Sequence, residues 1–236
     1  MTRTKIICTL GPASNTATVI RKMILFGMDV ARLNFSHGTH IEHKERLAIV
    51  RRINKKYRRH IRILQDLEGH RIRIGRLKDN LPIALKKRQR LWLLQDRDYI
   101  GSANAVSFDY AGSIKDIKTG QFIYIDDGNI SLKVKAVEKN KLETEVIIEG
   151  LLKARKGMNI PDARLEFAGL SPKDEEDVEF GIKNKVDYVA QSFVRNAKDV
   201  LEVRRLIKQR LPECRLIAKI ENRQGINNID EIIKVS

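Results

Sequence analysis

The 236-residue sequence predicts an α/β fold, namely a (β/α)8 barrel of the TIM type of which about five βα units are present. Strand-like and helix-like segments alternate along most of the chain, and repeated βα units imply parallel strands joined by right-handed crossovers. Neither G-x-G-x-x-G after the first strand nor G-x-x-x-x-G-K-[ST] occurs, which argues against a dinucleotide-binding sheet or a P-loop. Between about 70 and 160 no long helix is indicated, so we expect an all-β domain inserted after the third strand.

The predicted barrel elements are short and follow one another closely. We expect strands over 4–10, 29–38, 61–67, 186–193 and 214–222, and helices over 15–27, 41–57, 171–185, 197–210 and 226–235. Ser171, Pro172 and Asp174 form an N-terminal capping signal for the helix that begins there. The sequence therefore predicts the same kind of βα unit before and after the region at 70–160.

The inserted region carries β-like runs instead of helical periodicity. These runs are QRLWLLQ, AVSFDY, QFIYIDDGNISLKVKAV and LETEVIIEG, and the Asp-Asp-Gly-Asn segment at 126–129 predicts a hairpin turn. Trp92 and the other aromatic residues of this region are expected to form its small core. The expected domains are 1–69 (first part of the barrel), 70–160 (a β-barrel-like lid) and 161–236 (second, truncated part), with the lid over the C-terminal mouth where βα loops emerge.

Composition indicates a soluble globular protein. Hydrophobic residues make up 42% and charged residues 32% of the chain, and no apolar run approaches the roughly 18 residues of a membrane span. The N-terminus has no secretory signal pattern, and the two cysteines, Cys8 and Cys214, are far apart in apolar segments. We therefore expect buried free thiols and a cytoplasmic protein.

The formal net charge of +16 predicts anionic partners: phosphorylated metabolites, nucleotides or nucleic acid. Much of the excess lies in the basic runs at 51–63 and 85–90. The first run continues a helix with an apolar stripe, so its charges are better explained as a solvated helix face than as a binding site.

Residues 29–38 end in an unusual set of polar side chains. Ala31, Leu33 and Phe35 alternate with Arg32, Asn34 and Ser36, which is the period of a strand with one apolar face. Polar residues at the C-terminal ends of barrel strands line active sites. The polar face of this segment is therefore a candidate site.

Other strand ends carry charged residues as well. Asp66 ends the third predicted strand, and Lys219 and Glu221 lie two residues apart in the fifth, hence on one face. Glu221 could hold a hard divalent cation, and Lys219 could neutralise charge on a reacting oxygen. Arg32 fits two roles equally well, as a structural partner of Asp66 or as a ligand for phosphate or carboxylate.

Asn34, Ser36 and Asp66 offer oxygen atoms that suggest a cation site. His37, His40 and His43 recur every three residues, but no carboxylate pattern accompanies them. Loop and helix-start histidines are therefore favoured over a metal site.

Several segments together resemble pyruvate kinase, in order and with matching spacing. They are TKIICTLGPAS, GMDVARLNFSHGTH, LQDLEGHRIRIG, YIDDGNISLKV, KGMNIP, SPKDEEDVEFGI, VDYVAQSFVR and AKIEN, and they cover nearly the whole chain. The resemblance implies a glycolytic phosphotransferase that moves a phosphoryl group from phosphoenolpyruvate to ADP, giving pyruvate and ATP. It also implies a (β/α)8 barrel with a β domain inserted after the third strand.

The resemblance implies a role for each matching position. Arg32 binds the phosphoryl group, Lys219 stabilises the transition state, and Glu221 binds Mg²⁺ or Mn²⁺. A monovalent cation is held by Asn34, Ser36, Asp66 and the backbone carbonyl of Leu67, and the nucleotide is bound by Asn34, His37, Arg73 and Lys156. The family forms homo-tetramers, whereas the oligomeric state of this chain stays open, and neither a membrane nor nucleic acid is an expected partner.

Three residues near the implied cation site depart from the family pattern. The family usually has proline at the position of His70, Glu or Lys at that of Arg71, and Lys or Gln at that of Glu68. In the family an acid at the position of Arg71 accompanies a need for K⁺, and a lysine accompanies independence from it. Since Arg71 adds positive charge, we expect K⁺ not to be required.

The family sequence continues beyond the segment that matches the end of this chain. Its next segment, acidic-Gly-Ile-Met-Val-Ala-Arg-Gly-Asp-Leu-Gly, supplies a second metal ligand, whereas the sequence in hand ends at Ser236. Glu221 alone would hold Mg²⁺ weakly, because such sites use one or two carboxylates plus substrate phosphates. We therefore expect little or no turnover from the isolated 236-residue polypeptide.

Two alternative functions stay open. One is another Mg²⁺-dependent barrel enzyme acting on phosphoenolpyruvate or an enolate, which would lack the insertion at 70–160. The other is a non-catalytic basic remnant that binds nucleic acid or a partner, with affinity that falls as salt rises. The polar strand ends favour the pyruvate kinase interpretation over both.

Overall fold

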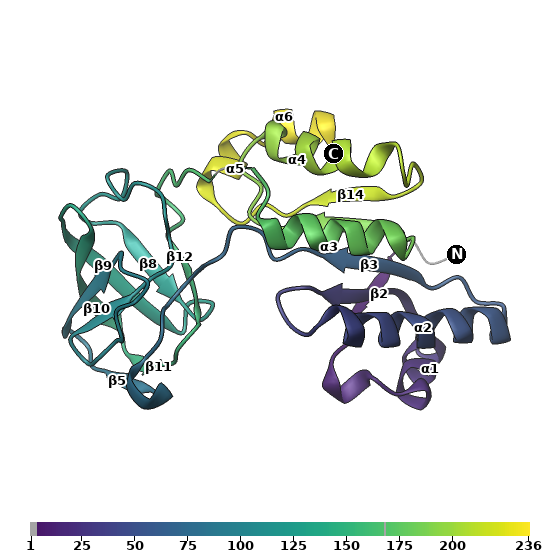
Figure 1. Ribbon diagram of the computed structural model, residues 1–236, viewed down its shortest axis with the longest axis horizontal. Coiled ribbons are helices and arrows are strands. Elements are labelled where there is room, and N and C mark those ends of the chain that lie inside the picture. Colours follow the sequence, from purple (N-terminus) through teal and green to yellow (C-terminus); the bar gives the residue numbers. More distant parts are fainter. Residues whose placement is uncertain (1–3, 168) are drawn as a thin grey trace. The chain divides into compact units, whose positions relative to one another are not determined.

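A computed structural model describes residues 4–167 and 169–236 (Figure 1). The chain divides into two compact units. The first falls within Met1–Gly69, Gly169–Ile220 and Asn228–Ser236, and the second within His70–Ala168 and Glu221–Asn227.

The first unit is built on a five-stranded parallel sheet in the order β1-β2-β3-β13-β14. Its elements are β1 (Ile6–Thr9), α1 (Ala17–Leu25), β2 (Met28–Asn34), α2 (His40–Tyr57), β3 (Arg62–Asp66), α3 (Pro172–Lys183), β13 (Tyr188–Gln191), α4 (Ala197–Lys208), β14 (Arg215–Ala218) and α6 (Ile229–Val235), with a short 3-10 turn, η1, at Pro12–Ser14. This is the α/β organisation expected from the alternating segments. The parallel strands bring their carboxyl ends to one edge of the sheet.

Alternation along the strands gives the sheet two different faces. Ala31, Leu33 and Ile63 are buried under the helices in the larger core of this unit. Val30 and Leu64, which alternate with them, belong to a smaller cluster on the opposite face. The period-2 pattern of the sequence therefore separates a helix-covered side from a sparsely packed side.

Side-chain caps fix where the helices begin. Thr39 caps α2, and the Glu42 side chain accepts a hydrogen bond from the Thr39 N–H, which completes a capping box. Ser171 caps α3 by accepting from the Asp174 N–H, with Pro172 in the first turn, as the sequence predicted. Both helices begin within one residue of the positions that the sequence predicted.

The predicted fifth strand is too long. β14 ends at Ala218, so Lys219 and Glu221 lie beyond the strand, and the expectation that they share a strand face is wrong. The neighbouring β13 ends at Gln191, and Phe193 adopts a positive φ of 56°. Beyond Gln191, β13 therefore offers β14 no extended backbone with which to continue the parallel pairing. The single helix predicted over 226–235 is also wrong: α5 (Arg223–Asn227), in the second unit, and α6 are separate helices.

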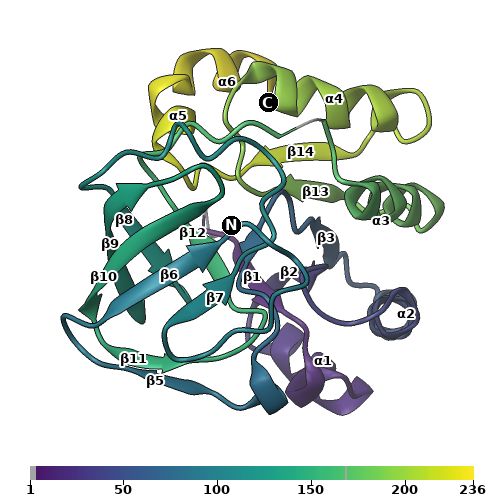
Figure 2. The ribbon, with the colours of Figure 1, turned by 60° about the vertical axis from the view of Figure 1, so that its left-hand side comes forward.

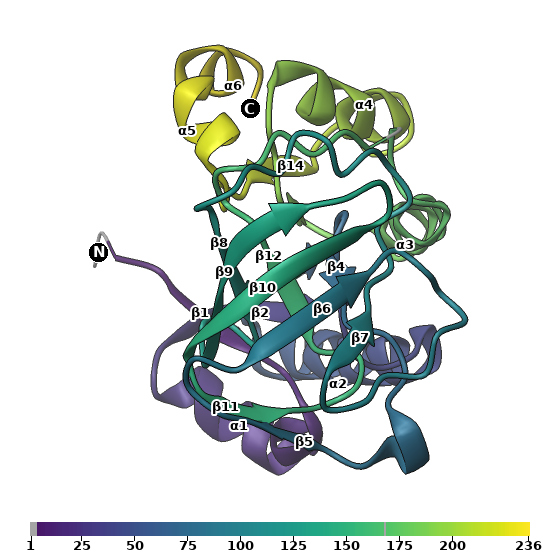
Figure 3. The same ribbon diagram turned by 90° about the vertical axis from the view of Figure 1, so that its left-hand side faces the viewer.

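The second unit consists mainly of β-structure. A seven-stranded sheet has the order β4-β12-β8-β9-β10-β6-β7, and β11 pairs with β5. The strands are β4 (Ile72–Arg73), β5 (Ile83–Leu85), β6 (Arg90–Leu94), β7 (Ala105–Ser107), β8 (Phe122–Ile125), β9 (Ile130–Val137), β10 (Lys141–Ile148), β11 (Gly150–Leu152) and β12 (Gly157–Asn159), with a short 3-10 turn, η2, at Lys78–Asn80. Figures 2 and 3 show how these strands curve around a shared interior.

The Asp-Asp-Gly-Asn segment forms the hairpin that the sequence predicted. Ile125 and Ile130 pair across the turn, and Asp126, Asp127 and Gly128 all have positive φ. The core of this unit is mostly aliphatic, with Phe108 and Tyr110 as its buried aromatic residues. Trp92 is only half-buried, with Lys141 over its ring at 4.4 Å, so its expected place in the core is wrong.

Among the described residues, no helix combines the length and the apolar character that a membrane crossing requires.

Candidate functional site

The buried carboxylate of Asp66, at the end of β3, contacts basic side chains from neighbouring segments of the first unit. Asp66 is 2% exposed, and its Oδ2 accepts a hydrogen bond from Arg32 Nε at 2.7 Å and forms an ion pair with Arg32 Nη2 at 2.6 Å. Lys219 Nζ approaches Asp66 Oδ1 at 3.1 Å. Two cations therefore share the carboxylate of Asp66.

Two hydroxyl groups complete this cluster. Arg32 Nη1 donates to Thr9 Oγ1 at 2.6 Å, and Lys219 Nζ donates to Ser192 Oγ at 2.7 Å. The Ser192 hydroxyl donates in turn to the Leu67 carbonyl at 2.6 Å. Thr9 and Ser192 were not predicted as site residues, yet both stand at the ends of strands, which is the signal that identified Asp66.

The structure contains the Arg32–Asp66 ion pair, one of the two roles that the sequence left open for Arg32. The side chains of Arg32 and Lys219 each remain 29% exposed. The pairing therefore leaves part of both cationic side chains at the surface, where an anion can reach them. A guanidinium and an ammonium beside hydroxyl groups suit a phosphate or carboxylate.

Oxygen atoms gather beside the cationic cluster. Asn34 and Asp66 are register partners on β2 and β3, and Asn34 Oδ1 accepts the Ser36 N–H at 3.0 Å. Leu67 follows directly after β3, and its carbonyl accepts a hydrogen bond from the Ser192 hydroxyl. Amide, carboxylate and carbonyl oxygens at the ends of these neighbouring strands are ligand types that a monovalent cation takes.

The three histidines of the α2 region have different surroundings. His37 is exposed, and its carbonyl accepts from His43 Nε2 at 2.9 Å. His43 is buried and stacks on Phe35, and this burial lowers the pKa of its imidazole. His40 Nε2 lies 2.5 Å from Asp177 Oδ1. Within residues 4–167 and 169–236 no group of three or more His, Cys, Asp or Glu side chains could hold a metal ion.

Four predicted residues belong to the second unit. Arg71 pairs with Asp127 at 3.0 Å, and Arg73 Nη1 donates to the Arg155 carbonyl at 3.0 Å. Their presence in one site with Arg32 stays a prediction.

Lys156 and Glu221 are the other two. Lys156 pairs with Asp126 at 2.7 Å, and this hydrogen bond lowers the pKa of the Asp126 carboxyl. Glu221 is exposed, and its carbonyl lies 3.5 Å from the Asn159 amide nitrogen. Neither contact tests the predicted role.

The two cysteines are free and partly exposed, not fully buried as expected. Burial of the Cys214 thiol raises its pKa to about 11. Cys214 therefore stays protonated at neutral pH, and a protonated thiol is a poor nucleophile.

Gly69 is the backbone position most sensitive to substitution beside this cluster. Its φ is +70°, and a Cβ there would stand 2.8 Å from the Ser192 carbonyl oxygen. We expect Gly69→Ala to lower the free energy of unfolding by about 2 kcal/mol, because an L side chain is strained at this φ and also meets backbone. Chemical denaturation measures the change.

Gly120→Ala is the matched control for this prediction. Gly120 has a φ of +92°, but its added Cβ would meet nothing within 4 Å. We expect this variant to lose only about 1 kcal/mol, the cost of the backbone conformation itself. Equal losses in the two variants would contradict the proposed clash with Ser192.

Parallel βα units with charged groups at the strand ends are typical of an α/β barrel-type protein. A sequence model described as "Pyruvate kinase, barrel domain" matches residues 1–236. The pyruvate kinases of Staphylococcus epidermidis and Staphylococcus aureus are 40% and 41% identical over 238 aligned residues. The chain belongs to the pyruvate kinase family.

The alignments cover different shares of the two partners. Each includes 100% of this chain but 40% of the relative. The chain therefore spans about two fifths of the length of the curated relatives it matches.

Proposed function

We propose that this chain takes part in glycolytic phosphoryl transfer from phosphoenolpyruvate to ADP, giving pyruvate and ATP in the cytoplasm. The observation that carries the proposal is the pair of cations, Arg32 and Lys219, on the single carboxylate of Asp66. Phosphoryl transfer depends chiefly on positioning and on neutralising phosphoryl oxygens. An arginine and a lysine held together near the ends of parallel strands suit that task.

Arg32 is the proposed ligand of the phosphoryl group. Its Nε and Nη2 are held by Asp66, and its Nη1 is held by Thr9. These contacts restrict the guanidinium to one orientation, so less side-chain entropy is lost when an anion binds.

Lys219 is the proposed group that neutralises charge developing on the reacting oxygen. Its ammonium is held by Asp66 and Ser192, which fix its position before the substrate arrives. Glu221 would hold Mg²⁺ or Mn²⁺, because an exposed carboxylate completed by substrate phosphates suits such an ion. The bound ion would supply further neutralisation of phosphoryl oxygens.

Asn34, Ser36, Asp66 and the Leu67 carbonyl are the proposed set for a monovalent cation. For the nucleotide we propose Asn34, His37, Arg73 and Lys156. The last two lie in the second unit, which we propose is the lid domain inserted after β3, between barrel parts 1–69 and 161–236. Closure of such a lid would exclude water that could otherwise accept the phosphoryl group.

Binding of phosphoenolpyruvate to Arg32→Met tests the proposal without depending on turnover. We expect titration calorimetry to show affinity at least tenfold lower than in the unaltered protein, because a charge-assisted contact is lost. Arg62→Met is the matched control, since Arg62 lies at the opposite end of β3 and pairs with Asp187. Equal affinity in Arg32→Met and the unaltered protein would contradict the proposed role.

Arg71 leads to a prediction about K⁺. We expect the activity of the full-length protein to be the same with and without K⁺, because the Arg71 guanidinium supplies positive charge that K⁺ would otherwise provide. Arg71→Glu is expected to create a K⁺ requirement, whereas Arg71→Lys is not. Coupled assays in K⁺-free and K⁺-containing buffers measure both, and strong K⁺ activation of the unaltered protein would refute the prediction.

A further inference from the structure

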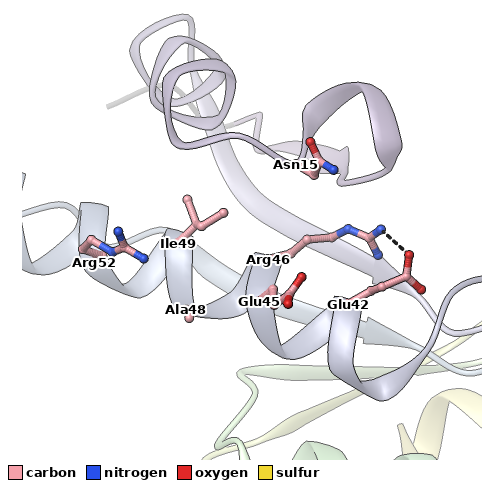
Figure 4. A pocket seen from close by; sticks show the side chains of 7 residues that line it. All are labelled: Asn15, Glu42, Glu45, Arg46, Ala48, Ile49 and Arg52. Carbon is pink, nitrogen blue, oxygen red and sulfur yellow. Dashed lines mark ion pairs between the residues drawn. The ribbon is translucent and has the colours of Figure 1, made fainter.

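A cavity of the first unit lies on α2, and none of its lining residues belongs to the Arg32–Asp66–Lys219 cluster. Its volume is about 380 Å³, within the range of small-molecule sites. The lining residues are Asn15, Glu42, Glu45, Arg46, Ala48, Ile49 and Arg52. Figure 4 shows Asn15, from the segment between η1 and α1, on the opposite side of the cavity from the α2 side chains.

Arg46 is a buried cation with few partners. It is 7% exposed, yet its Nε–H has no hydrogen-bond partner among the residues that the structure describes. Its Nη2 lies 3.6 Å from Glu42 Oε1, and its Nη1 lies 3.5 Å from His43 Nδ1. A guanidinium has five donors and stays charged, so leaving them unmet in a buried place is costly.

Two other arginines show what this edge of a guanidinium normally does. Arg32 directs Nε and Nη2 to Asp66 at 2.7 and 2.6 Å, and Arg195 directs them to Asp199 at 3.0 and 2.9 Å. In Arg46 the corresponding edge has only the loose contact to Glu42. It is therefore a carboxylate- or phosphate-binding edge without its oxyanion, on the wall of a cavity.

The acidic residues that line the cavity do not supply the missing oxyanion at the Nε–Nη2 edge of Arg46. Glu42 Oε2 already accepts from the N–H and the hydroxyl of Thr39 as part of the helix cap. Glu45 is exposed on α2. Arg52 adds a second positive charge, and the Asn15 amide adds two N–H donors across the cavity.

We propose that this cavity binds a small oxyanion, a phosphate or carboxylate group, through the Nε–Nη2 edge of Arg46. Arg52 and Asn15 supply the remaining polar contacts. The site is separate from the Arg32–Asp66–Lys219 cluster and does not depend on the proposed phosphoryl transfer. The ligand class follows from the planar, bidentate donor geometry of the guanidinium.

NMR of the arginine Nε–Hε groups tests this site separately from the strand-end cluster. Inorganic phosphate and acetate are titrated in turn into the ¹⁵N-labelled protein, and the signal lost in Arg46→Lys identifies Arg46. We expect phosphate, acetate or both to shift the Arg46 signal in a saturable way, and the responding anion defines the source of the oxyanion. If neither shifts it, the proposal is overturned, whatever happens at the Arg32 signal.

Three variants complete the test, followed at the Asn15 side-chain amide signal. Arg46→Met is expected to weaken binding at least tenfold, and Arg46→Lys to weaken it less, because a lysine cannot form the two-pronged contact. Lys55→Met removes a charge from an exposed position of α2 outside the lining and is expected to change affinity less than twofold. Unchanged binding in Arg46→Met, or an equal loss in Lys55→Met, would refute the site.

The melting temperature gives an independent readout. Without added anion, Arg46→Met is expected to melt at the same temperature as the unaltered protein or higher, since the variant removes an unsatisfied buried charge. Added phosphate is expected to raise the melting temperature of Arg46-containing protein more than that of Arg46→Met. A clear loss of stability in anion-free Arg46→Met would show that the arginine is already satisfied, which contradicts the proposal.

Discussion

Lys219→Met is expected to reduce the turnover number of the full-length protein by about 10²–10³-fold, with a smaller effect on KM for phosphoenolpyruvate. The reason is that the Lys219 ammonium is held in place by Asp66 and Ser192 and is proposed to act on charge that develops during the reaction. A coupled assay of pyruvate formation gives both parameters. The free energy of unfolding should change little, because one of the two cations competing for Asp66 is removed.

Arg215→Met is the matched control for Lys219→Met. Arg215 is the first residue of β14 and is exposed, so this variant removes a positive charge from the opposite end of the same strand. Its turnover number is expected to stay within about twofold of the unaltered protein. Lys219→Met with near-normal turnover, or an equal loss in Arg215→Met, would remove Lys219 from the proposed mechanism.

Asp66→Ala is expected to lower the free energy of unfolding by about 3 kcal/mol, the largest stability change among these predictions. The carboxylate is 2% exposed, and its removal takes away a counter-charge that Arg32 and Lys219 share. Because both cations keep partial contact with water, the loss falls at the lower end of the range for a broken buried pair. Equilibrium denaturation followed by circular dichroism measures it.

A double variant separates charge repulsion from loss of packing. Asp66→Ala combined with Lys219→Met is expected to regain at least about 1 kcal/mol over Asp66→Ala alone, because one of the two cations that shared Asp66 is removed. Asp29→Ala is the surface control: Asp29 accepts from the Ile6 N–H and from Lys5, which hold the pKa of its carboxyl below the ordinary value. It should lose much less stability than Asp66→Ala, because water screens an exposed ion pair. No recovery in the double variant would contradict the shared-carboxylate interpretation.

The first unit was predictable where local pattern decides structure. Alternation in residues 29–35 indicated β2 and its buried face, and Ser171, Pro172 and Asp174 indicated the start of α3. These signals act over a few residues, so the sequence shows them directly. The limits of β14 were not predictable, because they depend on where the neighbouring β13 ends.

The sequence predicted residues of the candidate site but not which of their side chains pair with one another. The sequence indicated Arg32, Asp66 and Lys219 from their positions at strand ends. It did not indicate that one carboxylate holds both cations, nor that Thr9 and Ser192 contact them. Residues 9, 66 and 192 meet only through the parallel order of the sheet, and no local pattern carries that information.

By itself, the sequence determined the βα units, the polar strand ends and the family to which the chain belongs, because all three are recorded in short-range order and motif spacing. The tertiary structure decided which charged side chains share a counter-ion and which buried donors lack a hydrogen-bond partner. Both outcomes depend on side chains that folding brings together from distant segments. The Asp66 carboxylate shared by Arg32 and Lys219 and the unsatisfied Nε of the buried Arg46 are examples. Burial sets the energetic cost of a charge, and burial is a property of the folded chain.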